Sequence, residues 1–414
     1  MMSFSEILLE DKGGKNLHLE HLEDEILNYG VDGGRAAINF LRSLRDMLSG
    51  STRSSLNMTV KWDGAPAIFA GIEPETGDFF VAKKSVFNVN PKLYKSAQEI
   101  DDDLSGTLNE KFKVALAEFS KLGIKGVLQG DLMWTDDTET TDIDGVSYIT
   151  FQPNTIVYAV PADSEMGKKV KASKIGIVWH TTYTGETLQG MTSSFGADIA
   201  GLEKSSSVWM DDATYKDVSG KATFTTAETE KITAVLSQTG KTFRKINANK
   251  LRTFLTVQNG MTGAIAGASL KTYNNSKVRA GEKISNPSSH AKGYEKWVQM
   301  SIQKQIDKAK SDKGKKKYTD MQKEYMREVR KHTGNLVQII TFQNLLVDAK
   351  MQIVKKLNSV KGLTDTFVKT KDGFKVTNPE GYVAIDRISG GAVKLVDRME
   401  FSFNNFTAIK AWDK

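Results

Sequence analysis

Cysteine is absent from the 414 residues of this chain. Its absence excludes disulfides, thiolate zinc sites and cysteine nucleophiles, and it fits a reducing cytoplasm. The chain also lacks any apolar run long enough to cross a bilayer. Its first ten residues contain neither the basic residues nor the cleavage site of a signal peptide. We therefore expect a cytoplasmic protein without a membrane partner.

The chain has only a small excess of charge of one sign. It contains 57 lysine and arginine residues against 50 aspartate and glutamate residues, which gives a net charge of +7 and a pI near 9.1. Over this length the balance is only a weak indication of a polyanionic partner. Hydrophobic residues make up 39% and charged residues 26%, as in ordinary globular proteins of two or three domains. The most basic stretch is residues 308–317, which contain six lysines.

Changes in pattern divide the chain into four parts. Residues 1–50 are predicted to be helical, because apolar residues recur at helical spacing along their second half. In residues 51–190, short β-prone runs alternate with glycine and proline turns, without the regular alternation of strand and helix that a doubly wound sheet shows. Residues 191–370 are predicted to be mostly helical, with an exposed polar loop at 272–290. Strands return in residues 371–414.

The order of these parts predicts an α+β protein with antiparallel sheets. Its β-rich domain is expected to be split in the sequence by the helical segment, which would then be a large insertion. In the first half of this domain, strands are expected at residues 56–62, 66–72, 79–83, 126–134, 146–151, 155–160 and 174–183, and a helix at 108–122.

The most informative motif is the tetrad Lys61-Trp62-Asp63-Gly64. An apolar, β-prone run ends at Lys61, turns on Asp63 and Gly64, and resumes at Ala67. A strand end of this kind can desolvate an amine or set it beside other cations, and either effect frees the amine as a nucleophile. The tetrad alone is equally compatible with a surface hairpin, because Asp-Gly is a common hairpin turn.

Four further elements follow in the chain. Lys84 follows a predicted strand as the second of two adjacent lysines, and Asp131 ends an apolar run. Glu380 comes directly before a predicted strand, and Lys394 lies inside an otherwise apolar strand. Each of these residues, taken singly, is also compatible with a turn or with a solvated side chain.

Together these elements resemble the motifs of the covalent nucleotidyltransferases, the superfamily of ATP-dependent DNA ligases, RNA ligases and mRNA capping enzymes. That family has, in order, K-x-D-G, a basic strand, a G-E-L-like strand, E-G-x-V and a closing strand with one or two lysines. Lys61, Lys84, Asp131, Glu380 and Lys394 stand in the same order here. The resemblance covers residues 55–185 and 372–400, and it implies an antiparallel-sheet nucleotidyltransferase domain of the ATP-grasp-like ligase type.

Within the superfamily, the match is closest to phage-type RNA ligases. Pro66 stands where DNA ligases and capping enzymes usually have arginine, and residues 152–157 are similar to a strand of phage RNA ligases. Asp131 stands where glutamate is usual, and Val396 where a second lysine is often found. The chain ends soon after Lys394, so we expect no C-terminal OB-fold like that of DNA ligases and capping enzymes.

The resemblance implies a reaction with ATP that depends on Mg²⁺ or Mn²⁺. Lys61 would attack the α-phosphorus and become lysyl-AMP, and Lys394 would lie beside the α-phosphate as a catalytic cation. Glu380 would act in catalysis by placing the metal ion, with Asp131 as a second metal ligand or as the partner of a ribose hydroxyl. The implied nucleotide-binding residues are Lys61, Asp63, Gly64, Lys84, Asp131, Tyr158 and Lys394.

The leading hypothesis is an ATP-dependent polynucleotide ligase for RNA ends rather than DNA ends, in the host cytoplasm if a phage encodes it. Alternatives are a nucleotidyltransferase with a protein or small-molecule acceptor, and a non-catalytic phage nucleic-acid-binding protein with a ligase-like fold. A binding protein needs no attacking lysine, so Lys61, Glu380 and Lys394 together favour an enzyme. The lysines at 308–317 can follow a phosphate backbone or form a solvated helix end. His180 is expected to be packed or hydrogen-bonded rather than catalytic.

Overall fold

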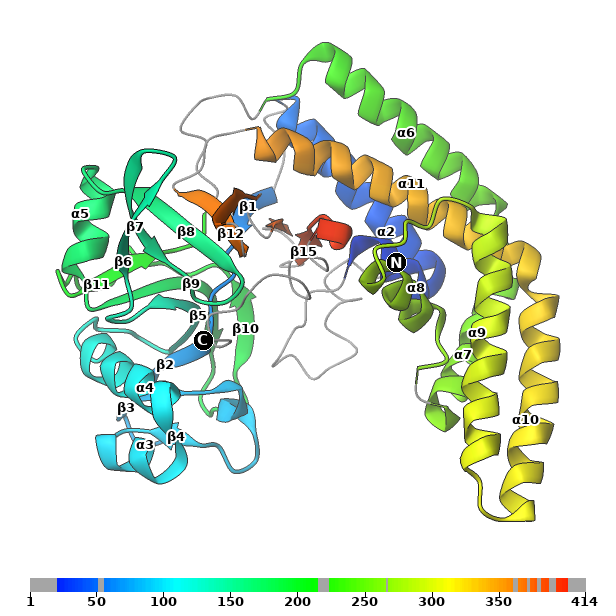
Figure 1. Ribbon diagram of the computed structural model, residues 1–414, viewed down its shortest axis with the longest axis horizontal. Helices are drawn as coiled ribbons and strands as arrows, with labels where there is room; N and C mark the ends of the chain where they lie inside the picture. Colours follow the sequence, from blue (N-terminus) through cyan, green and yellow to red (C-terminus); the bar gives the residue numbers. More distant parts are fainter. Residues whose placement is uncertain are drawn as a thin grey trace.

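The computed structural model describes residues 21–50, 56–214, 223–265, 267–359, 364–370, 373–377, 381–386 and 392–400. Figure 1 shows a β-rich lobe on the left and a helical lobe on the right, with a small sheet between them. No helix among these residues is long and apolar enough to span a membrane.

The largest sheet has seven strands, in the order β10-β9-β5-β2-β3-β4 with β11 beside β9. Its neighbours are antiparallel, apart from the parallel pair β11 and β9. Phe112 and Phe119, from a helix over one face, pack against Ile68 and Trp179, so that face is fully covered. The strands are β2 (Ala67–Ile72), β3 (Phe79–Ala82), β4 (Leu93–Tyr94), β5 (Val127–Trp134), β9 (Ile175–Thr184), β10 (Thr192–Phe195) and β11 (Val208–Asp211); the covering helices are α3 (Ala97–Asp103) and α4 (Gly106–Phe119).

A second sheet has five strands in the order β13-β12-β8-β7-β6. Trp134 of β5 contacts Phe151 of this sheet, with ring centroids 4.4 Å apart, so an aromatic core joins the two sheets. Two strands from the C-terminal part of the chain complete the sheet, since β12 pairs with β8. The strands are β6 (Glu139–Ile143), β7 (Val146–Phe151), β8 (Ile156–Pro161), β12 (Asp365–Thr370) and β13 (Gly373–Val376); helix α5 (Glu165–Ala172) contacts β7 and β8.

The small sheet joins the two lobes. It contains β1 (Leu56–Lys61), β14 (Gly381–Asp386) and β15 (Ala392–Leu395), in the order β1-β14-β15. Tyr382 and Ala384 of β14 belong to the same hydrophobic core as the helices. Because successive side chains of a strand point to opposite faces, the intervening residues of this sheet face the β-rich lobe.

The helical lobe is organised around α11 (Thr333–Asn358), which has twelve buried residues. It contacts α2 (Glu25–Leu48), α6 (Thr226–Lys245) and α9 (Pro287–Lys308). The helix starts follow from the sequence: Thr225 and Glu228 form a capping box for α6, and Asn286 caps α9 with Pro287 in its first turn. The remaining helices are η1 (Leu22–Asp24), η2 (Lys84–Phe87), α7 (Ala248–Ala264), α8 (Leu270–Arg279) and α10 (Asp312–Lys331).

The helical insertion is shorter than the predicted span of 191–370. It begins at Thr226, because β10 and β11 extend the seven-stranded sheet, and α11 ends at Asn358, before β12. The predicted loop at 272–290 is also wrong over 272–279 and 287–290, which lie in α8 and α9. The first of these parts, in α8, has an Asn- and Lys-rich sequence that resembles a loop, but its Tyr273 and Val278 are buried. Composition misled here because only one face of α8 is apolar.

Candidate active site

A cleft of ≈ 110 Å³ lies where the small sheet meets the seven-stranded sheet. Lys61 reaches it from the end of β1, and Asp131 and His180 reach it from β5 and β9. The rest of its lining is mostly apolar. The lining residues are Thr59, Val60, Lys61, Trp62, Asp131, Val178, His180, Phe195, Ala213 and Val383.

The register of the small sheet places two predicted lysines on one face. Lys61 pairs with Gly381, and Thr59 pairs with Val383 two residues further along β14. Lys394 of β15 is the other neighbour of Val383. Since directly opposed residues of antiparallel strands share a face, Lys61, Val383 and Lys394 all face the β-rich lobe. Segments more than three hundred residues apart in the sequence therefore meet at this cleft.

Gly381 is required where β14 begins. Its φ is +147°, and a Cβ atom on it would meet Val396 and lie 2.6 Å from the carbonyl oxygen of Leu395. Glu380, predicted to place the metal ion, lies outside the described residues. The next residue, Gly381, is paired directly with Lys61, so β14 begins beside the end of β1.

Asp63 of the tetrad fixes the turn that follows Lys61. Its buried carboxylate accepts hydrogen bonds from the Asn154 side chain (2.7 Å) and from the backbone N–H groups of Thr155 (2.7 Å) and Ile156 (2.9 Å). Burial raises the pKa of this carboxyl above its usual value, and the three hydrogen bonds and Lys61 oppose the shift. Asp63 therefore ties the end of β1 to the start of β8, which gives it a positioning role.

Tyr158 also supports the tetrad. Its hydroxyl accepts a hydrogen bond from the backbone N–H of Asp63 at 2.6 Å, and its ring is 2% exposed, stacked on Phe151 and near Trp62. Tyr158 does not line the cleft. The structure thus shows a core residue that positions the turn, and its predicted contact with the nucleotide stays a prediction.

Gly64 allows the tetrad to lie against β5. A Cβ atom at this position would be 2.5 Å from the Cβ of Asp131, so no other residue fits without a shift of the chain. The next residue, Ala65, donates its N–H to the carbonyl oxygen of Leu132 at 2.9 Å. The close approach of these two segments brings Asp131 to the cleft that Lys61 lines.

His180 is hydrogen-bonded, as expected, with its Nδ1 2.9 Å from the Thr181 hydroxyl, but its place in the lining of the cleft was not predicted. Gly130 pairs with Trp179 and Gln129 pairs with Thr181, so His180 is the extra residue of a β-bulge in β9. Its Nε2 lies 3.7 Å from Oδ1 of Asp131, and both side chains are partly exposed to the cleft. Bulges redirect side chains and are frequent beside active sites, but nothing in the alternation of residues 174–183 marks one.

Lys84 is not placed at the cleft by the described contacts. It begins η2, separated by one residue from the end of β3, and its side chain is exposed. Ala82, the last residue of β3, pairs with Phe69, while Asp131 pairs with Ala67. Lys84 thus leaves the seven-stranded sheet at the end where Asp131 lies, and its predicted role at the phosphates stays a prediction.

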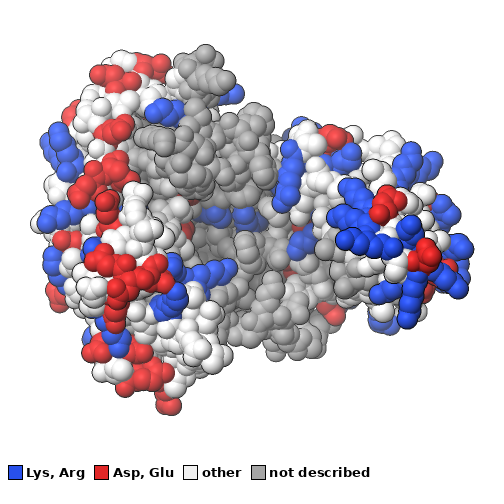
Figure 2. Space-filling model, turned by 60° about the horizontal axis from the view of Figure 1, so that its bottom comes forward, with Lys and Arg blue, Asp and Glu red and all other residues white. Residues whose placement is uncertain are grey.

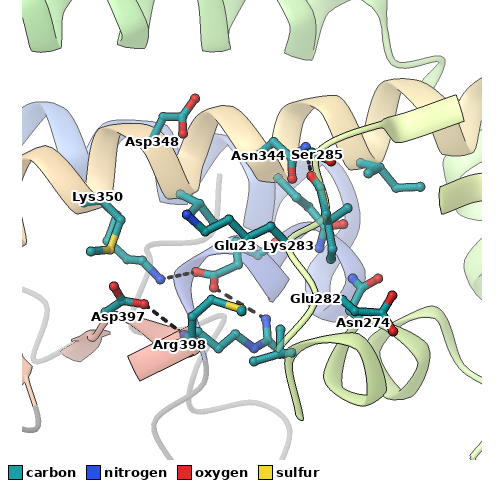
Figure 3. Close-up of a pocket in the computed structure, with 17 residues that line it drawn as sticks. Glu23, Asn274, Glu282, Lys283, Ser285, Asn344, Asp348, Lys350, Asp397 and Arg398 are labelled. Atoms are coloured by element: carbon teal, nitrogen blue, oxygen red, sulfur yellow. Dashed lines mark hydrogen bonds and ion pairs between the residues drawn. The ribbon is translucent and has the colours of Figure 1, made fainter. Parts of the chain in front are cut away.

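Lys394 is 8% exposed, and a cluster of buried charges holds the segment that follows it. Arg398 pairs with Asp24 (3.0 Å) and Glu23 (3.5 Å) of η1, and Lys350 of α11 pairs with Glu23 at 2.8 Å. Figure 3 shows Glu23, Lys350 and Arg398 converging beside a cavity of ≈ 540 Å³. We call Glu23, Asp24, Lys350 and Arg398 the buried ion cluster.

The buried ion cluster satisfies its own charges. Burial alone would raise the pKa of Glu23, but Lys350 and Arg398 hold that pKa well below its usual value. Burial raises the pKa of Asp24, and Arg398 opposes that shift. The backbone of His21 pairs with that of Lys394 in a single parallel β-bridge. Burial lowers the pKa of the His21 imidazole, so His21 adds no second positive charge beside Lys394. The cluster therefore fixes β15 against η1 and α11.

Replacing Lys350 by methionine should destabilise the protein by about 3–5 kcal/mol, because Glu23 would keep its buried charge without its closest partner. Lys350 is fully buried. The matched control is Lys169→Met, which removes a pair with Glu165 whose side chains are 65% and 85% exposed, and which should cost less than about 1 kcal/mol. Urea unfolding of both variants gives the comparison. Equal losses would mean that the cluster contributes no more than a surface pair.

Asp131 and the apolar lining are the parts of the cleft that could hold a nucleotide. Asp131 can accept a hydrogen bond from a ribose hydroxyl, and Phe195, Val178 and Val383 supply an apolar surface for a base. No group of three or more His, Asp or Glu side chains that could hold a metal occurs among the described residues. A single carboxylate still fits Mg²⁺, which usually binds through one or two carboxylates together with substrate phosphates.

Fold and site define a two-lobed protein of helices and mainly antiparallel sheets, with a lysine-lined cleft between a small and a large sheet. The chain belongs to a family of unknown function, DUF6267, whose profile matches residues 16–410. No curated protein and no solved structure matches the chain.

Proposed function

We propose that this protein is an ATP-dependent nucleotidyltransferase that forms lysyl-AMP on Lys61 and passes the AMP to the end of a polynucleotide, RNA rather than DNA. The observation that carries the proposal is the pairing of Lys61 with Gly381, with Lys394 on the same face of the small sheet. Three motifs that are ordered in the sequence as in the nucleotidyltransferases thus lie together in space.

The proposed first step uses the uncharged amine of Lys61. Its nitrogen attacks the α-phosphorus of ATP, an N–P bond forms, and the bond from that phosphorus to the pyrophosphate oxygen breaks. Pyrophosphate leaves with the bonding electrons, and the amine loses its proton to water. Lys394 supplies a fixed positive charge on the face where the phosphate oxygens gain charge. Mg²⁺ would neutralise the triphosphate at the mouth of the cleft.

In the proposed second step, AMP moves from Lys61 to a terminal phosphate of the polynucleotide. A phosphate oxygen attacks the phosphorus of lysyl-AMP, a P–O bond forms, and the N–P bond to Lys61 breaks. The amine takes up a proton and is ready for another cycle. The acceptor carries only negative charge near the reacting atoms, so the remaining cation of the small sheet, Lys394, favours its approach.

Incubation with ATP and Mg²⁺, followed by intact-mass measurement, tests the proposal. The expected result is a single added AMP moiety, which excess pyrophosphate removes. The protein is first treated with pyrophosphate, so that AMP already attached does not hide the reaction. The absence of an adduct with either ATP or GTP, in the presence of either Mg²⁺ or Mn²⁺, would overturn the proposal. Transfer of AMP to a protein but never to RNA would show that the acceptor is a protein.

Replacing Asp131 by alanine should raise the KM for ATP by about 10–100-fold, because a charged hydrogen bond to a ribose hydroxyl contributes about 1.5–3 kcal/mol. The value of kcat should change much less. The matched control is Asp136→Ala, an exposed aspartate just beyond β5. The ribose contact predicts that 2′-deoxy-ATP or 3′-deoxy-ATP is a poor substrate for the wild type and no worse than ATP for Asp131→Ala. If Asp131→Ala still discriminates against both deoxynucleotides as strongly as the wild type does, the ribose hydroxyls do not contact Asp131.

A further inference from the structure

The helices α9 and α10, joined by residues 309–311, form an arm that extends from the helical lobe (Figure 1). The two helices pack mainly on each other. Near the lobe the arm has a core that includes Val298, Ile302 and Val329. From Gln303 to Tyr325 no residue is buried, so the outer half is a solvated two-helix hairpin.

This arm carries the charge asymmetry of the whole protein. Residues 287–331 contain 13 lysine and arginine residues and 6 aspartate and glutamate residues, a net charge of +7. The rest of the chain contains 44 of each kind, and the net charge of the whole chain is also +7. In the view of Figure 2, lysine and arginine predominate on the helical lobe, whereas both signs are mixed over the β-rich lobe.

The densest part of this charge is not explained by the stability of the fold. Lys313, Lys315, Lys316 and Lys317 lie in the first two turns of α10, where the helix dipole favours acidic side chains and disfavours cations. All four are exposed, and none forms an ion pair with a described residue. Four like charges side by side also repel one another. A polyanion bound at the arm would relieve both costs.

We propose that the arm binds the phosphate backbone of the polynucleotide whose end reacts at Lys61. Lysine ammonium groups contact phosphates without reading sequence, which suits a ligase that must accept many ends. The 20 residues of α10 span about 30 Å, enough to follow several consecutive phosphates. Binding of a polynucleotide by the arm does not require the reaction at Lys61. Only the statement that the end of the bound strand reacts there rests on the proposed function.

The test compares two variants of the full chain with equal net charge. One replaces Lys313, Lys315, Lys316 and Lys317 by glutamine, which has a similar helix propensity. The other replaces four exposed lysines of the β-rich lobe that form no ion pair with a described residue: Lys125, Lys168, Lys171 and Lys204. Binding to a labelled single-stranded RNA of about 30 nucleotides, which can follow the length of the arm, is measured by anisotropy over a range of salt concentrations.

The arm variant should bind the RNA about tenfold or more weakly at low salt, and its slope of log affinity against log salt should fall by about 3, because four phosphate contacts are lost. The control variant should keep the wild-type slope. Thermal unfolding of the arm variant should occur at the wild-type temperature or above it, because the substitutions remove positive charges from a helix N-terminus, where they are unfavourable. Equal losses in the two variants would overturn the inference, because total charge and not the arm would then govern binding.

The adduct assay separates this inference from the proposed function. Both variants should form lysyl-AMP at the wild-type rate, since the arm contains no cleft residue. RNA binding through the arm in a protein that never forms an adduct would refute the enzyme and leave the arm assigned. An adduct with AMP in a protein whose RNA binding does not depend on the arm would support the enzyme and refute the role of the arm. If the arm variant lost binding to phosphatidylserine vesicles and kept wild-type RNA binding, the arm would be assigned to a membrane surface and the inference would be overturned.

Discussion

Replacing Lys61 by arginine should abolish the adduct with AMP completely. Arginine keeps the positive charge and most of the length of lysine, but its guanidinium does not lose a proton in proteins and so offers no free nitrogen for attack. The variant should fold normally, since Lys61 is the last residue of β1 and is only partly buried. Intact-mass measurement after incubation with ATP and Mg²⁺ gives the result, with Lys168→Arg, an exposed site remote from the cleft, as control.

Binding of the nucleotide should survive the same substitution. Calorimetry with α,β-methylene-ATP, which cannot lose pyrophosphate, should show an affinity within about tenfold of the wild type, because the contacts to ribose and base do not involve Lys61. If an adduct persists in Lys61→Arg, peptide mapping would show which other side chain carries it. An adduct on Lys394 would mean that the two lysines have been assigned in reversed roles.

The strands and turns that carry the site could be predicted from the local sequence pattern. The strand over residues 146–151 lies where its alternation placed it, and β1 ends at Lys61 directly before the Asp63-Gly64 turn. Strong apolar runs bounded by turn residues are specified locally, which is why these elements could be predicted. β14 and β15, which are far from β1 in the sequence, pair beside it in the small sheet.

The features that depend on distant contacts could not be predicted. Glu23 and Lys350 are separated by more than three hundred residues, and nothing near either one shows that the pair is buried. The bulge at His180 follows five consecutive buried residues of β9, so no alternating pattern precedes it that a break could interrupt. The short strands β10 and β11 owe their conformation to β9, since four residues carry little local preference.

The role of Asp63 shows why a motif residue needs its surroundings. Sequence order alone assigned it to the nucleotide, but its carboxylate already accepts three hydrogen bonds from the segment Asn154–Ile156. Those bonds hold the backbone after Lys61, and Gly64 then brings the turn against Asp131. Asp63 and Gly64 thus fix the backbone that carries Lys61.

Replacing Lys394 by methionine should slow adduct formation by about 10²–10³-fold, the effect expected when one preorganised charge is removed from a site where negative charge develops. Methionine fills a similar volume, so the cost should fall on the rate and not on the packing of β15 against the helical lobe. Lys394→Arg should recover much of the rate, because it restores the charge on the same face of the sheet. Stopped reactions analysed by intact mass give the rates, and urea unfolding gives the stability of each variant.

The reverse reaction decides whether Lys394 acts on the transition state. Removal of AMP by pyrophosphate passes through the same transition state as its attachment, so a group that stabilises only that state changes both rates by one factor. Lys394→Met should therefore slow the forward and reverse reactions equally and leave their equilibrium unchanged. If the lysine instead binds ATP and the lysyl-AMP form unequally, the equilibrium will shift. If both rates match the wild type, Lys394 is a buried structural cation, and the positive charge beside the phosphate must come from another residue.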